Sequence, residues 1–175
     1  MKGLKVGDPN DATTAIGPVI DKKQLDSHLK LIQEARNAGA RQLLGGNPEG
    51  QVLPPHVFVD VTNDMTIAQD EIFGPVAPII KVNGESEALR IANDTQYGLS
   101  SAVFTSDKER GVRFALGVQA GMTHVNDSSV DDTSTGPFGG EKNSGIGRFG
   151  GDWIMHELTR DHWVTIQHTP RSYPF

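Results

Sequence analysis

The strongest hydrophobic pattern in the chain lies in residues 21–39, where apolar side chains recur at the spacing of one helix face. The recurring positions are Leu25, Leu29, Ile32 and Ala35. Asp21 is a residue type that caps the start of helices, and Gly39 is a type that ends them. The pattern therefore predicts one amphipathic helix over this segment.

Shorter apolar runs alternate with helical patterns along the rest of the chain. Strands are predicted at residues 57–61, 77–82, 101–104 and 123–125, and helices at 85–93, 107–119 and 153–158. Strands that alternate with helices of this length are typical of α/β domains with parallel sheets. We therefore expect an α/β fold with a largely parallel sheet and flanking helices, followed by a last strand at residues 162–168.

Residues 126–151 break this alternation, because they are rich in glycine and polar residues and show no apolar periodicity. A loop of this length inside a compact domain is uncommon, and such loops often carry function. We therefore expect part of a functional site in this segment.

Composition restricts the classes of function. The chain has 175 residues with 36% hydrophobic and 22% charged residues, which is typical of a globular domain. Its net charge of −6, without a Lys/Arg cluster, disfavours nucleic-acid binding. Its start has no apolar core of a secretory signal, and no apolar run approaches the roughly 18–20 residues of a membrane span. We expect a cytoplasmic protein with no membrane association.

The chain contains no cysteine, so it has no disulfide, no thiolate metal ligand and no thiol nucleophile. Its 6 histidines lack the spacing of metal-binding motifs, and we interpret them as surface or packing residues. The acidic residues Asp127, Asp131 and Asp132 also lack the spacing of a Mg²⁺ or Ca²⁺ site. We expect no metal site.

The segment SGIGRFGG, residues 144–151, matches the Gly-x-Gly-x-x-Gly spacing of dinucleotide-binding loops. That loop requires a strand running directly into the glycines and a helix starting on the last glycine. The residues before it, PFGGEKN, are not a buried strand, so this match predicts no cofactor site.

A second candidate is QDEIFGPV, residues 69–76. The Glu71 carboxylate could accept hydrogen bonds from two ribose hydroxyls, and the Phe73 ring could pack on a heterocycle. The residues alone favour a simpler interpretation, a solvated acid before a core phenylalanine. Phe138, between a proline and two glycines, could equally fill the core or line a pocket.

Several segments together resemble the aldehyde dehydrogenase superfamily, in the family's order and from about residue 4 to residue 166. They are LKVGDPND–IGPVID, QDEIFGPV, ANDTQYGLSSAVFT, GMTHVND, PFGGEKNSGIGRFGG and HWVTIQ. The NDSSV loop and the GRFGG ending look most like the benzaldehyde and vanillin dehydrogenases.

The resemblance implies roles for individual residues. Glu71 matches the glutamate that binds the nicotinamide ribose, and Phe73 the aromatic residue beside the nicotinamide ring, which reverses the simpler interpretation above. Phe138 matches an aromatic residue of the substrate pocket. Ser129 and Val130 lie in the loop, residues 127–135, that shapes its mouth.

The resemblance also implies what the chain does not contain. In this family a cysteine thiolate attacks the aldehyde, hydride passes to NAD or NADP, and a glutamate-activated water hydrolyses the thioester. The cysteine, the glutamate and the cofactor domain lie upstream of the matching region, which corresponds to about the last third of a full member. We therefore expect a truncated dehydrogenase with no catalytic residue, no bound cofactor and no turnover of its own.

The resemblance divides the chain into residues 1–160, a portion of the catalytic domain, and residues 161–175, an oligomerisation strand and tail. This strand favours a homo-oligomer, because an exposed strand edge pairs with another chain. Two other functions remain open: an interaction module for full-length dehydrogenase subunits, and a small protein that binds a cofactor or aldehyde without chemistry.

Overall fold

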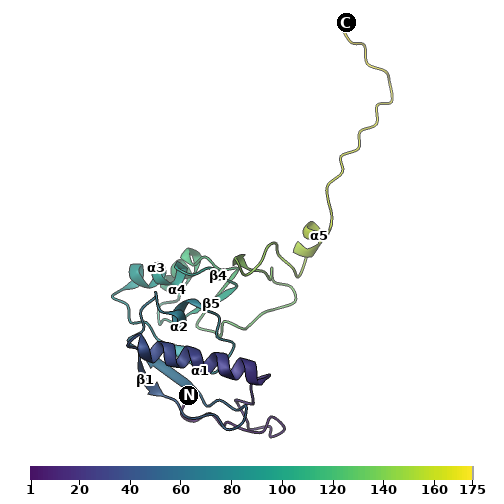
Figure 1. Cartoon of the computed structure of the whole chain (residues 1–175). Coiled ribbons are helices and arrows are strands. Elements are labelled where there is room, and N and C mark those ends of the chain that lie inside the picture. Colours follow the sequence, from purple (N-terminus) through teal and green to yellow (C-terminus); the bar gives the residue numbers. More distant parts are fainter. Residues whose placement is uncertain (175) are drawn as a thin grey trace. The chain divides into compact units, whose positions relative to one another are not determined.

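The computed structural model describes residues 1–174, which separate into two compact units, the first from Met1 to Gln96 and the second beginning at Tyr97. The first unit contains three helices and one three-stranded sheet (Figure 1). Its elements are α1 (Lys22–Asn37), β1 (Arg41–Leu44), β2 (His56–Val59), α2 (Thr66–Gln69), β3 (Val76–Pro78) and α3 (Glu85–Asn93). The central strand β2 pairs with β1 in antiparallel and with β3 in parallel orientation.

Helix α1 confirms the strongest sequence prediction. The Asp21 carboxylate caps it by accepting a hydrogen bond from the amide of Gln24 at 2.7 Å, and Gly39 follows its end with a φ of 94°. The buried face of α1 consists of Leu25, His28, Leu31, Ile32 and Ala35. Leu29, predicted for this face, is only partly buried, and the imidazole of His28 lies in the interior instead.

The core of the first unit forms where α1 meets the sheet. Phe58 of β2, Leu53 before it and Ile67 of α2 are almost completely buried together with Ile32. Burial of each such side chain contributes about 1.5–3 kcal/mol to folding. This core fixes α1 and the start of β3 relative to each other.

The second unit is built around a strand–helix–strand segment. Its elements are β4 (Tyr97–Gly98), β5 (Ser100–Val103), α4 (Lys108–Gly117), β6 (Met122–Val125), β7 (Glu141–Lys142) and α5 (Trp153–Leu158). Strands β5 and β6 are parallel, and α4 connects them. A Cβ on Gly111 of α4 would lie 2.7 Å from Val125, so this glycine allows the helix to pack closely on β6. Asp107 caps α4 by accepting from the amide of Arg110 at 3.0 Å.

The expectation of a largely parallel sheet is not confirmed, although the pairs β2–β3 and β5–β6 are parallel. The described residues form three small sheets, and the pairs β1–β2 and β4–β7 are antiparallel. Strand β1 was missed because its four residues follow α1 closely and precede the two glycines Gly45 and Gly46. Strands β4 and β7 have two residues each, too few for any hydrophobic period. The α/β class and the predicted helices α1, α3, α4 and α5 are confirmed.

Residues 162–168 form no strand in this single chain, and Figure 1 draws the segment after α5 without coils or arrows. Trp163, Val164 and Ile166 are exposed by 89%, 69% and 76%. A strand at this position would require a partner strand to supply its hydrogen bonds. The oligomerisation strand and the boundary at residue 160 therefore stay predictions.

Candidate functional site

The EIFGPV segment forms a turn between α2 and β3 in the first unit. Glu71 is exposed, and the Phe73 side chain is 78% exposed. The alternative of a core phenylalanine is therefore wrong. Phe73 also has a left-handed backbone, with a φ of 49°. This conformation costs a residue other than glycine on the order of 1–3 kcal/mol and persists only where the surroundings impose it.

Two side chains of α1, Gln24 and His28, contact this turn. The carbonyl of Ile72 lies 2.7 Å from Nε2 of His28, and because a carbonyl only accepts, this nitrogen carries the proton and donates. The side-chain amide of Gln24, one helical turn earlier, donates to the same carbonyl at 3.4 Å. A Cβ on Gly74 would lie 2.4 Å from Cε1 of His28, so only glycine fits between the turn and this ring.

The turn exposes a carboxylate, on Glu71, and an aromatic ring, on Phe73. A carboxylate accepts hydrogen bonds from two neighbouring hydroxyls, and an exposed aromatic face packs on a flat ring. Glu71 and Phe73 lie two residues apart, and neither side chain is buried in its own unit. Both groups are therefore available to a ligand.

The second unit contains a pocket of about 290 Å³ in which Phe138 forms one wall. The other lining residues are Gly121, Met122, His124, Asp131, Asp132, Thr133, Gly136 and Pro137. Of the two interpretations of Phe138, the structure favours the pocket, because the side chain is 38% exposed. Nε2 of His124 is buried without a hydrogen-bond partner among the described residues.

Two other predicted substrate residues lie outside this pocket. The carbonyl of Ser129 accepts a hydrogen bond from the hydroxyl of Ser100 at 2.6 Å, and the side chain of Val130 is 85% exposed. Asn126, at the start of the same loop, accepts from the amide of Thr105 at 2.7 Å. This bond joins the loop to the segment that follows β5.

The backbone of the SGIGRFGG segment pairs with the backbone of Phe138. Phe138 and Phe149 form an isolated antiparallel bridge. The glycines at 145, 147, 150 and 151 have positive φ angles, and α5 begins only at Trp153. No helix starts on the last glycine, so the segment lacks the geometry of a phosphate-binding loop.

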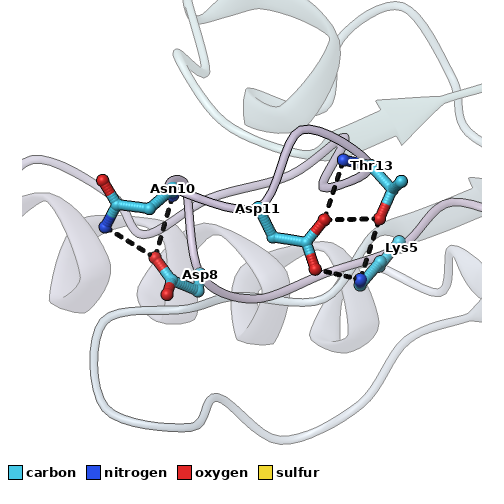
Figure 2. Close-up of polar contacts among 5 residues, drawn as sticks. All are labelled: Lys5, Asp8, Asn10, Asp11 and Thr13. Carbon is cyan, nitrogen blue, oxygen red and sulfur yellow. Dashed lines mark hydrogen bonds and ion pairs between the residues drawn. The ribbon is translucent and has the colours of Figure 1, made fainter.

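The loop at residues 5–13 is rich in polar contacts (Figure 2). It borders a pocket of about 410 Å³ in the first unit. Asp11 accepts hydrogen bonds from Lys5 and from the hydroxyl and the amide of Thr13, the last two at 2.6 and 2.9 Å. Asp8 accepts from the amide of Asn10 at 2.9 Å. None of the predicted site residues lines this pocket.

Residues 1–174 show neither a cluster of metal ligands nor a membrane-spanning helix. No group of three potential ligands among histidine, aspartate and glutamate is placed to hold a metal ion there. Over the same residues, no helix has the length and apolar character needed to cross a membrane.

His28 lies beside the turn and was not among the predicted site residues. It is 1% exposed, and it stands at the helical spacing of Leu25, Ile32 and Ala35. A histidine on an otherwise apolar face was a visible signal that a polar partner would be needed in the interior. The identity of that partner, the carbonyl of Ile72, depended on the fold.

Comparisons with known proteins identify relatives over the full chain. A family model described as "Aldehyde dehydrogenase family" matches residues 1–164. Benzaldehyde dehydrogenase YfmT of Bacillus subtilis is 45% identical over 100% of this chain and 36% of its own length. Vanillin dehydrogenase of Corynebacterium glutamicum is 44% identical, over 95% of this chain and 34% of its own.

Solved structures agree with these matches. A salicylaldehyde dehydrogenase from Pseudomonas putida G7, complexed with salicylaldehyde, has a TM-score of 0.92 at 39% identity, over 99% of this chain and 36% of its own. An aldehyde dehydrogenase of Mycobacterium tuberculosis complexed with NAD⁺ has a TM-score of 0.86 at 41% identity, over 91% and 34%. GapN of Methanocaldococcus jannaschii, complexed with NADP, has a TM-score of 0.83 at 38% identity, over 90% and 34%.

Proposed function

The chain belongs to the aldehyde dehydrogenase family, and from this membership we propose that it forms the C-terminal part of a catalytic domain that oxidises an aromatic aldehyde to its carboxylic acid. The curated relatives that support an aromatic substrate are named for benzaldehyde and vanillin. The chain spans about a third of their length. The activity is therefore proposed for a protein in which these residues join the rest of such a domain.

Within that domain, the turn at residues 71–76 would contribute to the binding of NAD or NADP. The Glu71 carboxylate would accept hydrogen bonds from the ribose hydroxyls, and the Phe73 ring would pack on the nicotinamide. The cofactor would supply the oxidising step by accepting hydride from the aldehyde. The observation that carries this proposal is the 78% exposed ring of Phe73, held at a backbone angle that an aromatic residue rarely adopts.

The second unit would contribute to the substrate site. Phe138 would offer an aromatic face to the ring of the aldehyde, since aromatic pairs gain energy beyond the area that they bury. Ser129 and Val130 would lie at the mouth of the substrate tunnel. The position of Phe138 at a pocket of about 290 Å³ supports the first of these roles.

The 175 residues contain no cysteine, so a protein made of these residues alone has no thiol to attack an aldehyde. We propose that such a protein has no dehydrogenase turnover and binds no NAD measurably. Titration calorimetry with NAD⁺ and an assay of NAD⁺ or NADP reduction with benzaldehyde test both statements. Turnover by a pure sample would overturn the first, and a measurable heat of binding the second.

A hybrid enzyme tests the roles of the turn. This chain replaces the matching 175 residues of YfmT, whose remaining part would supply the family's cysteine and cofactor domain. We expect the hybrid to oxidise benzaldehyde, and Glu71→Gln or Phe73→Ala to raise KM for the cofactor about tenfold through one lost contact. Asp70→Asn, which changes the exposed neighbouring acid, is the matched control. A folded hybrid without turnover, or one with an unchanged KM in the Glu71 and Phe73 variants, would contradict the proposal.

One observation favours a second function, an interaction module for full-length dehydrogenase subunits. The exposed apolar side chains of Trp163, Val164 and Ile166 follow each other in one segment after α5. Such a segment would gain stability by adding a strand to another subunit. Co-purification of the tagged chain with YfmT tests this function, with a chain lacking residues 162–175 as the control. Equal recovery with both chains would exclude it.

A further inference from the structure

We propose that His28 is a positioning residue that holds Phe73 in its left-handed conformation and so sets the aromatic contact with the cofactor. The inference rests on the proposed function of the turn at residues 71–76. It assigns a role to a buried side chain of α1 that lies 45 positions before Phe73 in the sequence.

Phe73 cannot maintain its conformation through its own side chain. The ring is 78% exposed, so packing within the first unit holds it only weakly. A φ of 49° is unfavourable for a residue with a Cβ, and an exposed turn would relax to a negative φ if nothing opposed it. The restraint must therefore act on the backbone on either side of Phe73.

Before Phe73, the restraint is the hydrogen bond at Ile72. The carbonyl of Ile72 belongs to the peptide plane that ends at the amide nitrogen of Phe73, and φ of Phe73 is the rotation about the next bond. His28 donates to this carbonyl at 2.7 Å, a short distance for an N–H donor. The hydrogen bond from His28 therefore restrains the peptide plane between Ile72 and Phe73, and φ of Phe73 is measured relative to this plane.

After Phe73, the restraint is steric. The backbone at Gly74 lies against the imidazole so closely that a Cβ there would be 2.4, 2.5 and 2.9 Å from Cε1, Nε2 and Nδ1 of His28. The chain therefore runs along the face of the same ring that binds the preceding carbonyl. One side chain restrains both peptide groups that flank Phe73.

His28 is itself held firmly enough for this role. It is 1% exposed on the buried face of α1, and Gln24, on the same face one turn earlier, donates to the same carbonyl. In the neutral ring, donation from Nε2 corresponds to the tautomer in which Nδ1 carries no proton. Nδ1 is buried and has no hydrogen-bond partner among residues 1–174. The side-chain nitrogen of Gln24 also lies 3.0 Å from Nε2, but the carbonyl of Ile72 is nearer, at 2.7 Å, and can only accept, so we assign the proton to Nε2.

NMR spectroscopy of the unsubstituted 175-residue chain gives the first test. We expect the ¹⁵N shifts of His28 to show the Nε2–H tautomer and the backbone shifts and HN–Hα coupling of Phe73 to show a positive φ. The Nδ1–H tautomer, or a negative φ at Phe73, would overturn the inference without the use of any variant.

Substitutions give the second test. His28→Leu keeps an apolar volume but removes the donor, and we expect Phe73 to lose its positive φ, whereas His28→Gln keeps an N–H donor and should retain it. His56→Leu is the matched control, because His56 is also 1% exposed and its Nδ1 donates to the carbonyl of Pro54 at 2.7 Å. An equal change at Phe73 in the His28→Leu and His56→Leu chains would show that His28 acts only through general stability. An unchanged positive φ in the His28→Leu chain would show that His28 does not hold Phe73, and either result would overturn the inference.

In the hybrid enzyme, His28→Leu should raise KM for the cofactor about tenfold with kcat within about twofold, as one lost hydrogen bond predicts. The NMR measurements involve no cofactor, so they can fail while the proposed function holds. If Phe73→Ala leaves KM unchanged, the proposed function fails instead, whatever the conformation of Phe73.

Discussion

Phe138 and Phe149 exchange both backbone hydrogen bonds: the amide of Phe138 donates to the carbonyl of Phe149 at 2.8 Å, and the amide of Phe149 donates back at 2.7 Å. This bridge holds the aromatic wall of the pocket in the second unit to the glycine-rich segment at residues 144–151. The glycines therefore have a structural purpose, since they allow two loops to approach each other through their backbones.

Gly150, next to the bridge, is one of the positions where the two loops approach most closely. Its φ is 89°, and a Cβ would lie 2.3 Å from the carbonyl oxygen of Gly136. We expect Gly150→Ala to lower the free energy of unfolding in urea by about 1–3 kcal/mol, because backbone has to move. Gly50→Ala, with a φ of 60° and open space around it, isolates the cost of the backbone angle alone, about 1 kcal/mol.

Gly3→Ala completes this series, because Gly3 has nothing within 4 Å and no positive φ. Its unfolding free energy should stay within about 0.5 kcal/mol of the unsubstituted chain. Equal losses in the Gly150 and Gly50 variants would show that the close approach to Gly136 does not exist.

Arg148 supports the same pair of loops from its side chain. Its Nη1 donates to the carbonyls of Gly140 and Gly147, both at 2.9 Å, and its Nη2 forms an ion pair with Glu141. A lysine presents a point charge and cannot reproduce this fork. We expect Arg148→Lys to lower the free energy of unfolding by about 1–3 kcal/mol, since carbonyls lose their partners.

The matched control is Arg41→Lys. Arg41 forms an ion pair with Asp60 at 2.9 Å, and the two side chains are 62% and 61% exposed. An exposed pair of this kind contributes at most about 1 kcal/mol, and its loss should change the unfolding free energy by less than about 0.5 kcal/mol. If both substitutions cost the same, the carbonyl contacts of Arg148 contribute no stability of their own.

The sequence best predicted those elements that are long enough to show a hydrophobic period within their own residues. Helix α1 was found from its apolar spacing and its cap at Asp21, and α4 from Asp107 and the pattern after it. Strands β1, β4 and β7 were missed because they are too short to show a period and exist only through pairing with distant residues. Their prediction would have required the tertiary contacts themselves.

The candidate site was predictable only in part. The resemblance carried Glu71, Phe73 and Phe138, whereas local reasoning placed Phe73 in the core because large aromatic residues are usually buried. The backbone next to Phe73 is bound instead by His28, which donates to the carbonyl of Ile72 from 44 positions earlier in the chain. No spacing rule for a single segment contains that relationship.

Asp11 has an unusual pKa that a variant can test. The hydrogen bond from Lys5, and then those from the hydroxyl and amide of Thr13, lower the pKa of this carboxyl from 3.8 to about 2 (Figure 2). We expect Lys5→Met to raise the pKa of Asp11 only part of the way back, because both bonds from Thr13 remain. The pKa is measured by NMR titration of the Asp11 carboxyl carbon, with Lys2→Met as a control for the loss of one positive charge.

The sign of the linked stability follows from this lowered pKa. A carboxyl that is more acidic in the folded state contributes stability that is full above its ordinary pKa of 3.8 and is lost as pH falls through about 2. Lys5→Met should therefore destabilise the chain at neutral pH and have a smaller effect at pH about 2. An effect that does not depend on pH would mean that Lys5 acts through packing and not through Asp11.

Residues 162–168 carry the exposed apolar side chains of Trp163, Val164 and Ile166. If this segment adds a strand to another subunit, its backbone amides form hydrogen bonds there, and a proline in its centre removes one donor and disrupts the pairing. We expect Thr165→Pro to shift the mass measured by light scattering from an oligomer to a monomer, as deletion of residues 162–175 should also do. Ser172→Pro, beyond the segment, should leave the mass unchanged. An oligomer that survives both the deletion and Thr165→Pro would show that the subunits associate through another surface, because neither the apolar side chains nor the amide of Thr165 would then be required.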